Sequence, residues 1–395
     1  MNAVARDARI AVSAVLAHGR VARVEISARR PVGVGRLALG KPAEAMVALV
    51  PRLFALCAAA QGAAATLALS AARGETLPSD VVATQAAAVL TERLIELLRG
   101  TITSLAADQF PIFAPPLRSL IAGARRSDAR GQLEPDAIDA LADGLDAICL
   151  SEHSLDDPDT YRAWLASASP LAALHVSRVR SLRARGEGRG EGAFRQGREL
   201  ADDTPFEADF GAIAIDPLTA ADDHVIGTAL LRHGAHFAAR PDLAGRVPET
   251  GALARLAEHP LIRSVGSGLS GRSLARLIEA TTTPQRLRAL RGGEADAADL
   301  LRATSLGDGI GLGAVECARG RLHHLIALDH HGCIARYEIL APTEWNFHPE
   351  GPLARALVGA PLCVCEDDRQ RLAALVAAFD PCVGFDVELR ESADA

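Results

Sequence analysis

Two cysteines near opposite ends of the chain stand in the segments best suited to chemistry. Cys57 lies in RLFALCAAAQ, residues 52–61, and Cys382 lies in DPCVGFDVE, residues 380–388. Cysteine thiolates are nucleophiles and ligands for soft metal ions. Both segments also carry charged or amide side chains, which orient and neutralise such ligands. Two thiols that the fold brings together are therefore a candidate metal site.

Two of the other cysteines and two histidine pairs suggest a different metal site. The candidate ligands are Cys317, Cys333, His323, His324, His330 and His331, and the remaining cysteines are Cys149, Cys363 and Cys365. Thiolate and imidazole are the usual ligands of zinc. Adjacent residues of a strand point to opposite faces, so each histidine pair offers only one ring to any one site. The C-V-C sequence also lacks the two-residue spacer of a zinc knuckle or thioredoxin-type motif. We interpret these residues as packing histidines and inert thiols, with Cys149 in the core and zinc as the alternative.

A glycine-rich string at residues 266–271 matches G-x-G-x-x-G and precedes a predicted helix at 273–281, as a phosphate-binding loop does. No βαβ pattern surrounds it, and no acidic residue follows at the end of a second strand. We interpret the string as a turn, with a dinucleotide site as the alternative.

Composition limits the functions open to the chain. Its 395 residues include 42 Lys and Arg against 49 Asp and Glu, a net charge of −7, which excludes a basic nucleic-acid footprint. A hydrophobic fraction of 49% excludes global disorder. The weakly polar stretch 54–69 is shorter than the roughly 20 apolar residues of a bilayer span. Residues 1–10 lack the apolar stretch of a secretory signal, so we expect a cytoplasmic protein without a membrane partner and without a disulfide framework.

Hydrophobic periodicity predicts the elements that position the cysteines. Residues 8–28 alternate around His18-Gly19 and predict one β-hairpin, and residues 322–340 predict another that turns at His331-Gly332. From Pro42 a helical pattern runs through Cys57 and places it on the apolar face, with a break or kink at Pro51.

Further helical patterns make the expected fold mainly α (α+β). They cover about 80–100, 116–126, 135–149 and 158–183, and a last helix carries Leu372 to Phe379 just before Cys382. Residues 183–200 mix glycine with both charge signs and predict a flexible insertion. We expect a single domain over residues 1–395 that contains this insertion.

The residues around Cys57 and Cys382 resemble the two cysteine motifs of nickel-iron hydrogenase large subunits. Those motifs read R-x-C-x-x-C-x-x-x-H and D-P-C-x-x-C-x-x-H, and their four thiolates hold nickel and an iron with cyanide and carbon monoxide ligands. Similar segments follow in family order over most of the chain, at residues 39–42, 318–324 and 332–346. The resemblance implies a large-subunit-like helical core with small N-terminal and C-terminal β-hairpins.

The same alignment shows that most of the metal ligands have been replaced. Phe54 and Phe385 stand at two of the four thiolate positions, so only Cys57 and Cys382 remain. The two motif histidines are replaced by Gln61 and Glu388, and Gly35 aligns with the glutamate that relays protons in hydrogenases. The resemblance therefore implies a protein that binds no nickel and is not an enzyme.

This pattern resembles the HupK/HoxV class of hydrogenase maturation proteins, which are thought to hold the iron, cyanide and carbonyl fragment before nickel is added. Iron with three diatomic ligands has three positions left, which two thiolates and one further donor can fill. The resemblance implies a non-catalytic scaffold that binds this fragment transiently. The implied partners are the hydrogenase large subunit and hydrogenase maturation chaperones.

The resemblance also implies roles for individual residues. Cys57 and Cys382 are expected to meet in a buried pocket and bind the iron. Arg319 matches the family's active-site arginine and is expected to lower the thiol pKa and pair with a cyanide nitrogen. Asp380 is expected to hold Arg319 or its loop. Because Cys57 matches a metal-bridging position and Cys382 a nickel-terminal one, a shared iron has to be displaced from its place in a hydrogenase.

Two other functions stay open at this point. In the first, both cysteines are incidental and the chain is a metal-free interaction module that assists assembly of the large subunit. In the second, the chain is a divergent active hydrogenase, which the phenylalanines at two ligand positions disfavour.

Overall fold

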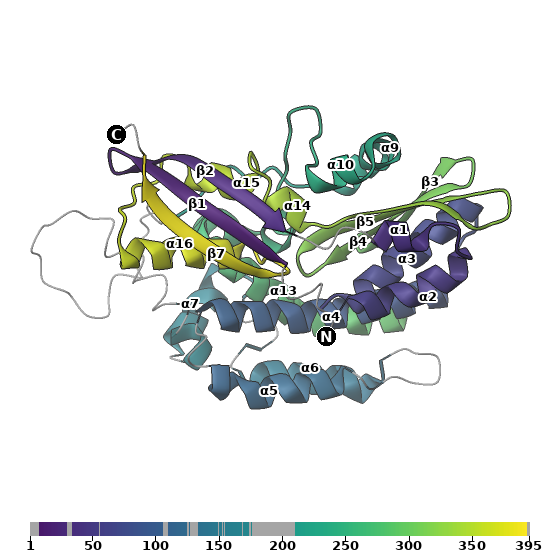
Figure 1. Ribbon diagram of the computed structural model, residues 1–395. Helices are drawn as coiled ribbons and strands as arrows, with labels where there is room; N and C mark the ends of the chain where they lie inside the picture. The colour runs from purple at the N-terminus through teal and green to yellow at the C-terminus, as the bar shows by residue number, and fades with distance from the viewer. Residues whose placement is uncertain are drawn as a thin grey trace, which may run out of the picture.

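The computed structural model describes residues 8–29, 34–54, 56–105, 110–124, 126, 133–148, 150–151, 153, 155–167, 169–173, 175 and 210–392. Within these residues the chain is mainly helical and contains two sheets (Figure 1). The predicted insertion at 183–200 and Cys149 lie outside the described residues. Every helix within these ranges is too short or too polar to cross a lipid bilayer.

The helices of the first half include the two that meet at Cys57, α2 and α3. They are α1 (Val34–Ala38), α2 (Ala43–Leu53), α3 (Ala58–Arg73), α4 (Ser79–Leu105), α5 (Phe110–Gly123), α6 (Pro135–Asp146) and α7 (Pro158–Ala166). Those of the second half are α9 (Asp223–His233) after a short 3-10 turn (Ala220–Asp222), α10 (Ala235–Ala239), α11 (Ala252–Arg255), α12 (Pro260–Val265), α13 (Leu269–Gly292), α14 (Thr343–Asn346), α15 (Pro352–Leu357) and α16 (Glu366–Ala378).

A three-stranded sheet joins the two ends of the chain (Figure 1). Its central strand, β1 (Arg9–Ala17), pairs antiparallel with β2 (Arg20–Arg29) and parallel with β7 (Gly384–Glu391). The predicted hairpin is confirmed: His18 and Gly19 both have positive φ, as a tight two-residue turn requires. Because β7 begins two residues after Cys382, its pairing with β1 fixes the position of that cysteine.

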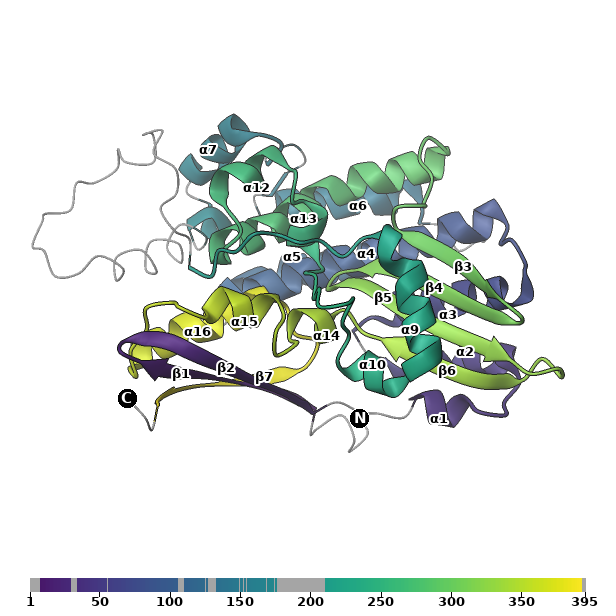
Figure 2. The same cartoon turned by 90° about the horizontal axis from the view of Figure 1, so that it is seen from above.

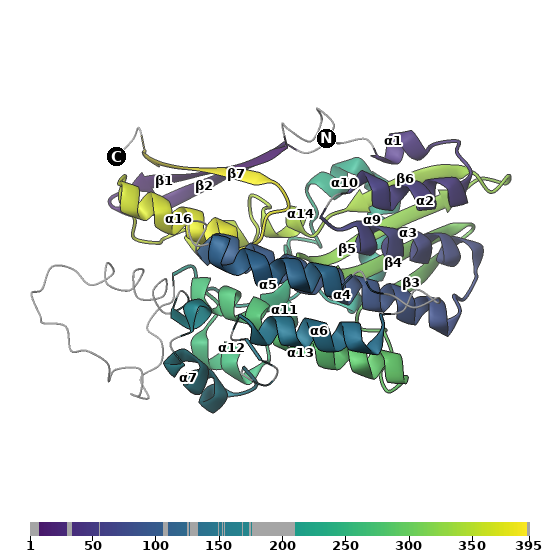
Figure 3. The same cartoon turned by 90° about the horizontal axis from the view of Figure 1, so that it is seen from below.

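A four-stranded antiparallel sheet carries the second predicted hairpin. Its order is β3 (Leu301–Gly307), β4 (Ile310–Cys317), β5 (Gly320–Leu328) and β6 (Ile334–Leu340), so β5 and β6 form the hairpin and two further strands extend it. Helix α9 covers one face of this sheet (Figure 2), and α3 lies on the opposite face (Figure 3).

Glycines on β4 allow α3 to lie very close to the sheet. A Cβ atom added to Gly313 would lie 2.1 Å from the carbonyl oxygen of Ala64, and one added to Gly311 would lie 2.1 Å from that of Ala68. These distances are far below van der Waals contact, so only glycine fits at these positions. The small alanine side chains of α3 also allow the helix to lie this close to β4.

The structure corrects the prediction of one helix that runs through Cys57. Helix α2 ends at Leu53, α3 begins at Ala58, and Cys57 is the N-cap residue of α3 with φ −145°. The chain does not break at Pro51, which lies inside α2. The cysteine therefore stands at a helix start, where backbone N–H groups are unpaired within the helix.

Candidate functional site

The Cys57 sulfur lies at the end of a chain of hydrogen bonds. Gln61 Nε2 donates to Cys57 Sγ at 3.6 Å, and His324 Nε2 lies 2.8 Å from Gln61 Oε1. On the other side of the ring, Tyr337 Oη lies 2.8 Å from His324 Nδ1. Burial lowers the pKa of His324 to about 3, so its ring is neutral. With Tyr337 donating to Nδ1, every hydrogen in the chain points toward the sulfur.

Arg319 lies at the tip of the β4–β5 hairpin. It occupies the two-residue turn between Cys317 and Gly320 and is 6% exposed. Its Nη2 donates to Glu96 Oε2 of α4 at 3.0 Å, while its Nε lies 3.9 Å from Asp380 Oδ2. Burial alone would lower the pKa of Arg319, but Asp380 and Glu96 raise it above its ordinary value. The guanidinium is therefore a permanent buried positive charge.

The segment after α16 brings Asp380 and Cys382 to this arginine. Asp380 has φ 53°, and its Oδ1 lies 4.0 Å from Arg276 Nη2 of α13. Cys382 Sγ lies 3.6 Å from Thr343 Oγ1 of α14. Two buried atoms that face each other, Arg319 Nε and Asp380 Oδ2, have no hydrogen-bond partner. Buried polar atoms without partners are rare and costly, so this contact is one that a ligand can complete.

A small cavity adjoins Arg319 and Asp380. Its volume is about 20 Å³, enough for about one water molecule. Its charged lining comprises Arg272, Arg276 and Arg319 with Glu249 and Asp380. Arg272 donates to Glu249 Oε2 at 2.9 Å and stacks over the Phe379 ring. The cavity wall is thus rich in guanidinium groups, as a site for an anionic ligand requires.

Both predicted thiols interact electrostatically with one guanidinium, that of Arg319. Within the described part of the chain no hydrogen bond or disulfide joins the two sulfurs. A direct meeting of Cys57 and Cys382 therefore stays a prediction, whereas their common neighbour Arg319 is observed.

Arg319 lowers the pKa of Cys57, as expected, but the net pKa of this thiol is raised. Burial, with a smaller contribution from Cys317, brings it to about 12. Gln61 and Arg319 act in the opposite direction but do not compensate. Because desolvation exceeds the attraction of the guanidinium, Cys57 is a neutral thiol at pH 7.

Comparison with known proteins identifies the family. The family of nickel-dependent hydrogenases matches residues 262–387. The hydrogenase expression/formation protein HupK of Bradyrhizobium diazoefficiens is 35% identical over 395 residues and 98% of each chain is covered. The corresponding protein HoxV of Cupriavidus necator is 30% identical over 393 residues, with 93% of each chain covered. The chain belongs to the HupK/HoxV family of hydrogenase expression/formation proteins.

Solved structures confirm the expected fold of this HupK/HoxV-family protein. The Ni-Fe-Se hydrogenase from Desulfomicrobium baculatum superposes with a TM-score of 0.58 at 15% identity, over 93% of this chain and 95% of that chain. The enzyme from Desulfovibrio vulgaris Hildenborough gives 0.53 at 18% identity, over 93% and 95%. The fold is therefore hydrogenase large-subunit-like, as the sequence motifs imply.

The two phenylalanines that the motif resemblance aligns with ligand positions pack into separate clusters of this HupK/HoxV-family protein. Phe54 packs with Met46, Val50 and Tyr337, and Phe385 packs with the hydrophobic face of the three-stranded sheet. Gly35 has no room for a side chain, since a Cβ atom would lie 2.2 Å from the carbonyl oxygen of Tyr337. A glutamate at Gly35 is thus sterically excluded.

Several site residues were missed by the sequence reasoning. Glu92 on α4 accepts from the backbone N–H groups of Ala59 at 2.7 Å and Ala60 at 3.1 Å, and so caps α3 beside Cys57. Burial raises the pKa of Glu92 to about 7. Glu96, which holds Arg319, lies one turn further along α4. The available signal was the pair Glu92 and Glu96, spaced by four within the most apolar part of this helix.

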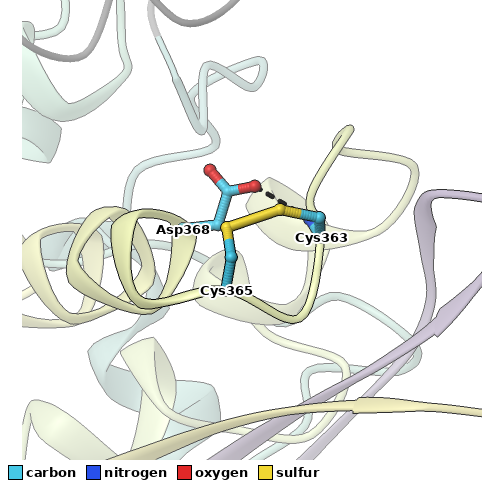
Figure 4. Close-up of side chains that lie close together, drawn as sticks. All are labelled: Cys363, Cys365 and Asp368. Atoms are coloured by element: carbon cyan, nitrogen blue, oxygen red, sulfur yellow. Dashed lines mark hydrogen bonds between the residues drawn. A yellow bond between two sulfur atoms is a disulfide. The ribbon is translucent and has the colours of Figure 1, made fainter.

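The C-V-C sequence is not a pair of free thiols. Cys363 and Cys365 form a disulfide just before α16, with Cα atoms 5.5 Å apart (Figure 4). Asp368 Oδ2 accepts from the backbone N–H of Cys363 at 2.8 Å. The interpretation as inert thiols is wrong because the turn into α16 brings both sulfurs together. Both cysteines are exposed and lie apart from the Arg319 cavity lining.

Proposed function

We propose that this protein is a non-catalytic scaffold in nickel-iron hydrogenase maturation. Its cargo is iron that carries cyanide and carbonyl ligands, which it holds before transfer to the hydrogenase large subunit. Maturation chaperones deliver the fragment. The named role of its relatives, hydrogenase expression and formation, supports a function in maturation, and the cargo and partners are the parts that we add.

The observation that carries the proposal is a buried guanidinium that interacts electrostatically with both retained cysteines. The guanidinium belongs to Arg319, and its Nε has no hydrogen-bond partner. Thiolates suit iron, and an N–H group aimed into a desolvated space suits a cyanide nitrogen. The pattern supports a site for a metal fragment that carries negative charge on its outer atoms.

Hydrogen bonding to Cys57 supports a role for its sulfur as an electron-pair donor. The chain from Tyr337 through His324 and Gln61 ends in an N–H group that donates to Sγ. Such a donor stabilises a thiolate or a metal-bound sulfur more than a neutral thiol. Since the pKa of Cys57 is about 12 in the metal-free protein, iron binding has to displace a proton from this thiol.

The size of the cavity implies movement during loading. A volume of about 20 Å³ is far smaller than an iron atom with three diatomic ligands. The Asp380 carboxylate pairs with its two arginines at 3.9 and 4.0 Å, longer than a hydrogen bond, whereas β7 is fixed by pairing to β1. Displacement of residues 380–383 is therefore the simplest way to admit the cargo.

Infrared spectroscopy tests the proposal, because cyanide and carbonyl stretches fall in a region where proteins do not absorb. The protein is purified without oxygen from a host that matures hydrogenase. We expect both kinds of band in the wild type and in Cys333→Ser, a control at another half-buried cysteine. Cys57→Ser and Cys382→Ser should each lose them.

Two outcomes contradict the scaffold. Absence of the bands from the wild type, with binding to the large subunit intact in both variants, favours the metal-free module. Hydrogen uptake by the isolated chain favours the enzyme.

A further inference from the structure

We propose that Cys317 is a third thiol ligand for the cargo iron, beside Cys57. This inference rests on the proposed function and assigns the donor that the two retained motif cysteines leave open. Cys317 lies outside both cysteine motifs. Its position follows from the packing of α3 on β4.

The register of α3 against β4 brings Cys317 to Cys57. Gly311 lies against Ala68, and Gly313 lies against Ala64, so two residues along the strand correspond to four along the helix in the opposite direction. These steps agree in length, since two strand residues rise about 6.6 Å and four helical residues about 6 Å. Two further steps lead from residue 313 to 317 on the strand and from 64 to about 56 on the helix. Cys317 is therefore level with the N-cap of α3, which is Cys57.

Strand alternation gives the direction of the Cys317 side chain. Gly311, Gly313 and Val315 face α3, and Cys317 continues this odd-numbered series. The even-numbered Leu312 packs on the α9 side instead. Cys317 is 6% exposed and belongs to the same hydrophobic cluster as Ala60, against which Cys57 packs. The two thiols thus face each other across the start of α3.

Polar neighbours suit Cys317 as a thiolate once a metal binds. The backbone N–H of Arg319 donates to its sulfur, and the guanidinium of Arg319 acts on it electrostatically. The two sulfurs also interact electrostatically with each other. Two neighbouring thiols in a space shielded from water form a donor pair for one soft metal ion.

A third thiol completes the coordination of the cargo. Iron with three diatomic ligands leaves three adjacent positions, which Cys57, Cys317 and Cys382 fill. Cys317 and Arg319 lie on one hairpin tip, so the same turn supplies a ligand to the iron and a hydrogen-bond donor to its cyanide. The iron then lies nearer to the end of β4 than a site built from Cys57 and Cys382 alone.

Cobalt(II) alone provides the probe, because sulfur-to-cobalt charge-transfer absorption grows with the number of bound thiolates. All proteins carry Cys363→Ser and Cys365→Ser, which removes the exposed pair, and are titrated without oxygen. We expect Cys317→Ala to lose about a third of the charge-transfer intensity. Cys333→Ala, the matched control on the same sheet, should keep all of it. Circular dichroism checks that each variant is folded.

The outcomes separate this inference from the proposed function. Cys317 is not a ligand if Cys317→Ala retains the full charge-transfer intensity while Cys57→Ala and Cys382→Ala each lose intensity. The two-thiol scaffold then stands. If no protein shows charge-transfer bands, both proposals fail. If Cys317→Ala does not fold, a short bifunctional thiol reagent is applied to the protein with Cys317 intact. Mass spectrometry should then find Cys57 bridged to Cys317, and its absence overturns the inference.

Discussion

The two faces of the four-stranded sheet both bury charged or ionisable groups, but they treat them differently. The ion pairs on the α9 side join Asp223 of α9, Arg321 of β5 and Glu316 of β4, and continue to Arg255 of α11 and Glu279 of α13. We call this continuous series the ion ladder. On the α3 face lie Cys57, Cys317 and the Gln61–His324 hydrogen bond. The hairpin tip with Arg319 joins the two.

The charged side chains of the ion ladder pair with one another. Arg321 donates to both oxygens of Asp223 at 2.7 and 2.5 Å, and Arg255 donates to both oxygens of Glu279 at 2.6 and 2.7 Å. Although burial alone would raise them, the arginines hold the pKa values of Asp223 and Glu279 at about 2. The five ion-ladder side chains thus bury no nitrogen or oxygen atom without a hydrogen-bond partner, although the adjoining His323 Nδ1 and Arg93 Nε have none.

The polar groups around Arg319 are less completely paired than those of the ion ladder. Its contacts with Asp380 are longer than a hydrogen bond, two facing atoms have no partner, and the nearby Glu92 has a pKa raised to about 7 by burial. Buried polar groups that lack partners reduce stability. Buried charges are therefore fully paired in the ion ladder and incompletely paired around Arg319, as the proposed ligand site requires.

The largest effect is expected from a break in the ion ladder. Arg321→Met leaves Asp223 buried without its bidentate partner, so the free energy of unfolding should fall by about 3–5 kcal/mol. Arg302→Met is the matched control, because exposed Arg302 lies 3.9 Å from the same carboxylate and should cost less than about 0.5 kcal/mol. Urea unfolding measures both. Equal, small losses would show that the ladder is not a stabilising unit.

A second prediction concerns pH. The pKa of Glu92 is raised in the folded state, so the folded chain binds more protons than the unfolded chain between the ordinary value of 4.5 and about 7. Stability from this group is therefore complete below that window and is lost as the pH rises through it. Glu92→Gln should remove the loss and stabilise the protein at pH 8 by on the order of 2 kcal/mol.

The control for Glu92 is Glu75→Gln, at an exposed residue just beyond the opposite end of α3. Thermal unfolding at pH 5 and pH 8 separates the two variants. If Glu92→Gln changes the stability equally at pH 5 and pH 8, the pKa of Glu92 is not raised. The contrast with the low pKa values of the ion-ladder carboxylates would then be lost.

The third and smallest prediction compares Arg319 with Arg321, two residues away. After Arg319→Met, Glu96 keeps its pair with Arg99 at 2.6 Å and Asp380 keeps Arg276. We therefore expect a loss of only about 1–2 kcal/mol in the free energy of unfolding, with loss of the cargo's infrared bands. A loss as large as that of Arg321→Met would mean that Arg319 is chiefly structural.

Local signals predicted the fold better than they predicted the site. Both hairpins followed from alternation and turn residues, and the opposite directions of His323 and His324 are confirmed by their partners Asp223 and Gln61. The start of α3 at Ala58 was not predictable, because Glu92 caps it from a helix that is distant in sequence. The Cys363–Cys365 disulfide was missed because the C-V-C spacing gave no sign of it.

The candidate site depended on resemblance for its first residues and on tertiary packing for the others. Arg319 and Asp380 were named from family motifs, and they do lie together. Glu96 and Cys317 come from α4 and β4, and nothing in either local sequence shows that they meet at Arg319. Cys317 has the pattern of an ordinary core residue until the register of α3 on β4 is known.

The central claim is that the cargo lies against Arg319, and the infrared spectrum of Arg319→Lys tests it most directly. Lysine keeps the positive charge but not the guanidinium N–H geometry. We predict that the variant loaded in a hydrogenase-maturing host retains cyanide and carbonyl bands, with the cyanide bands shifted more than the carbonyl band. Arg302→Lys should leave all bands in place. Cyanide bands that are identical in Arg319→Lys and the wild type, or absent from both, would contradict the account.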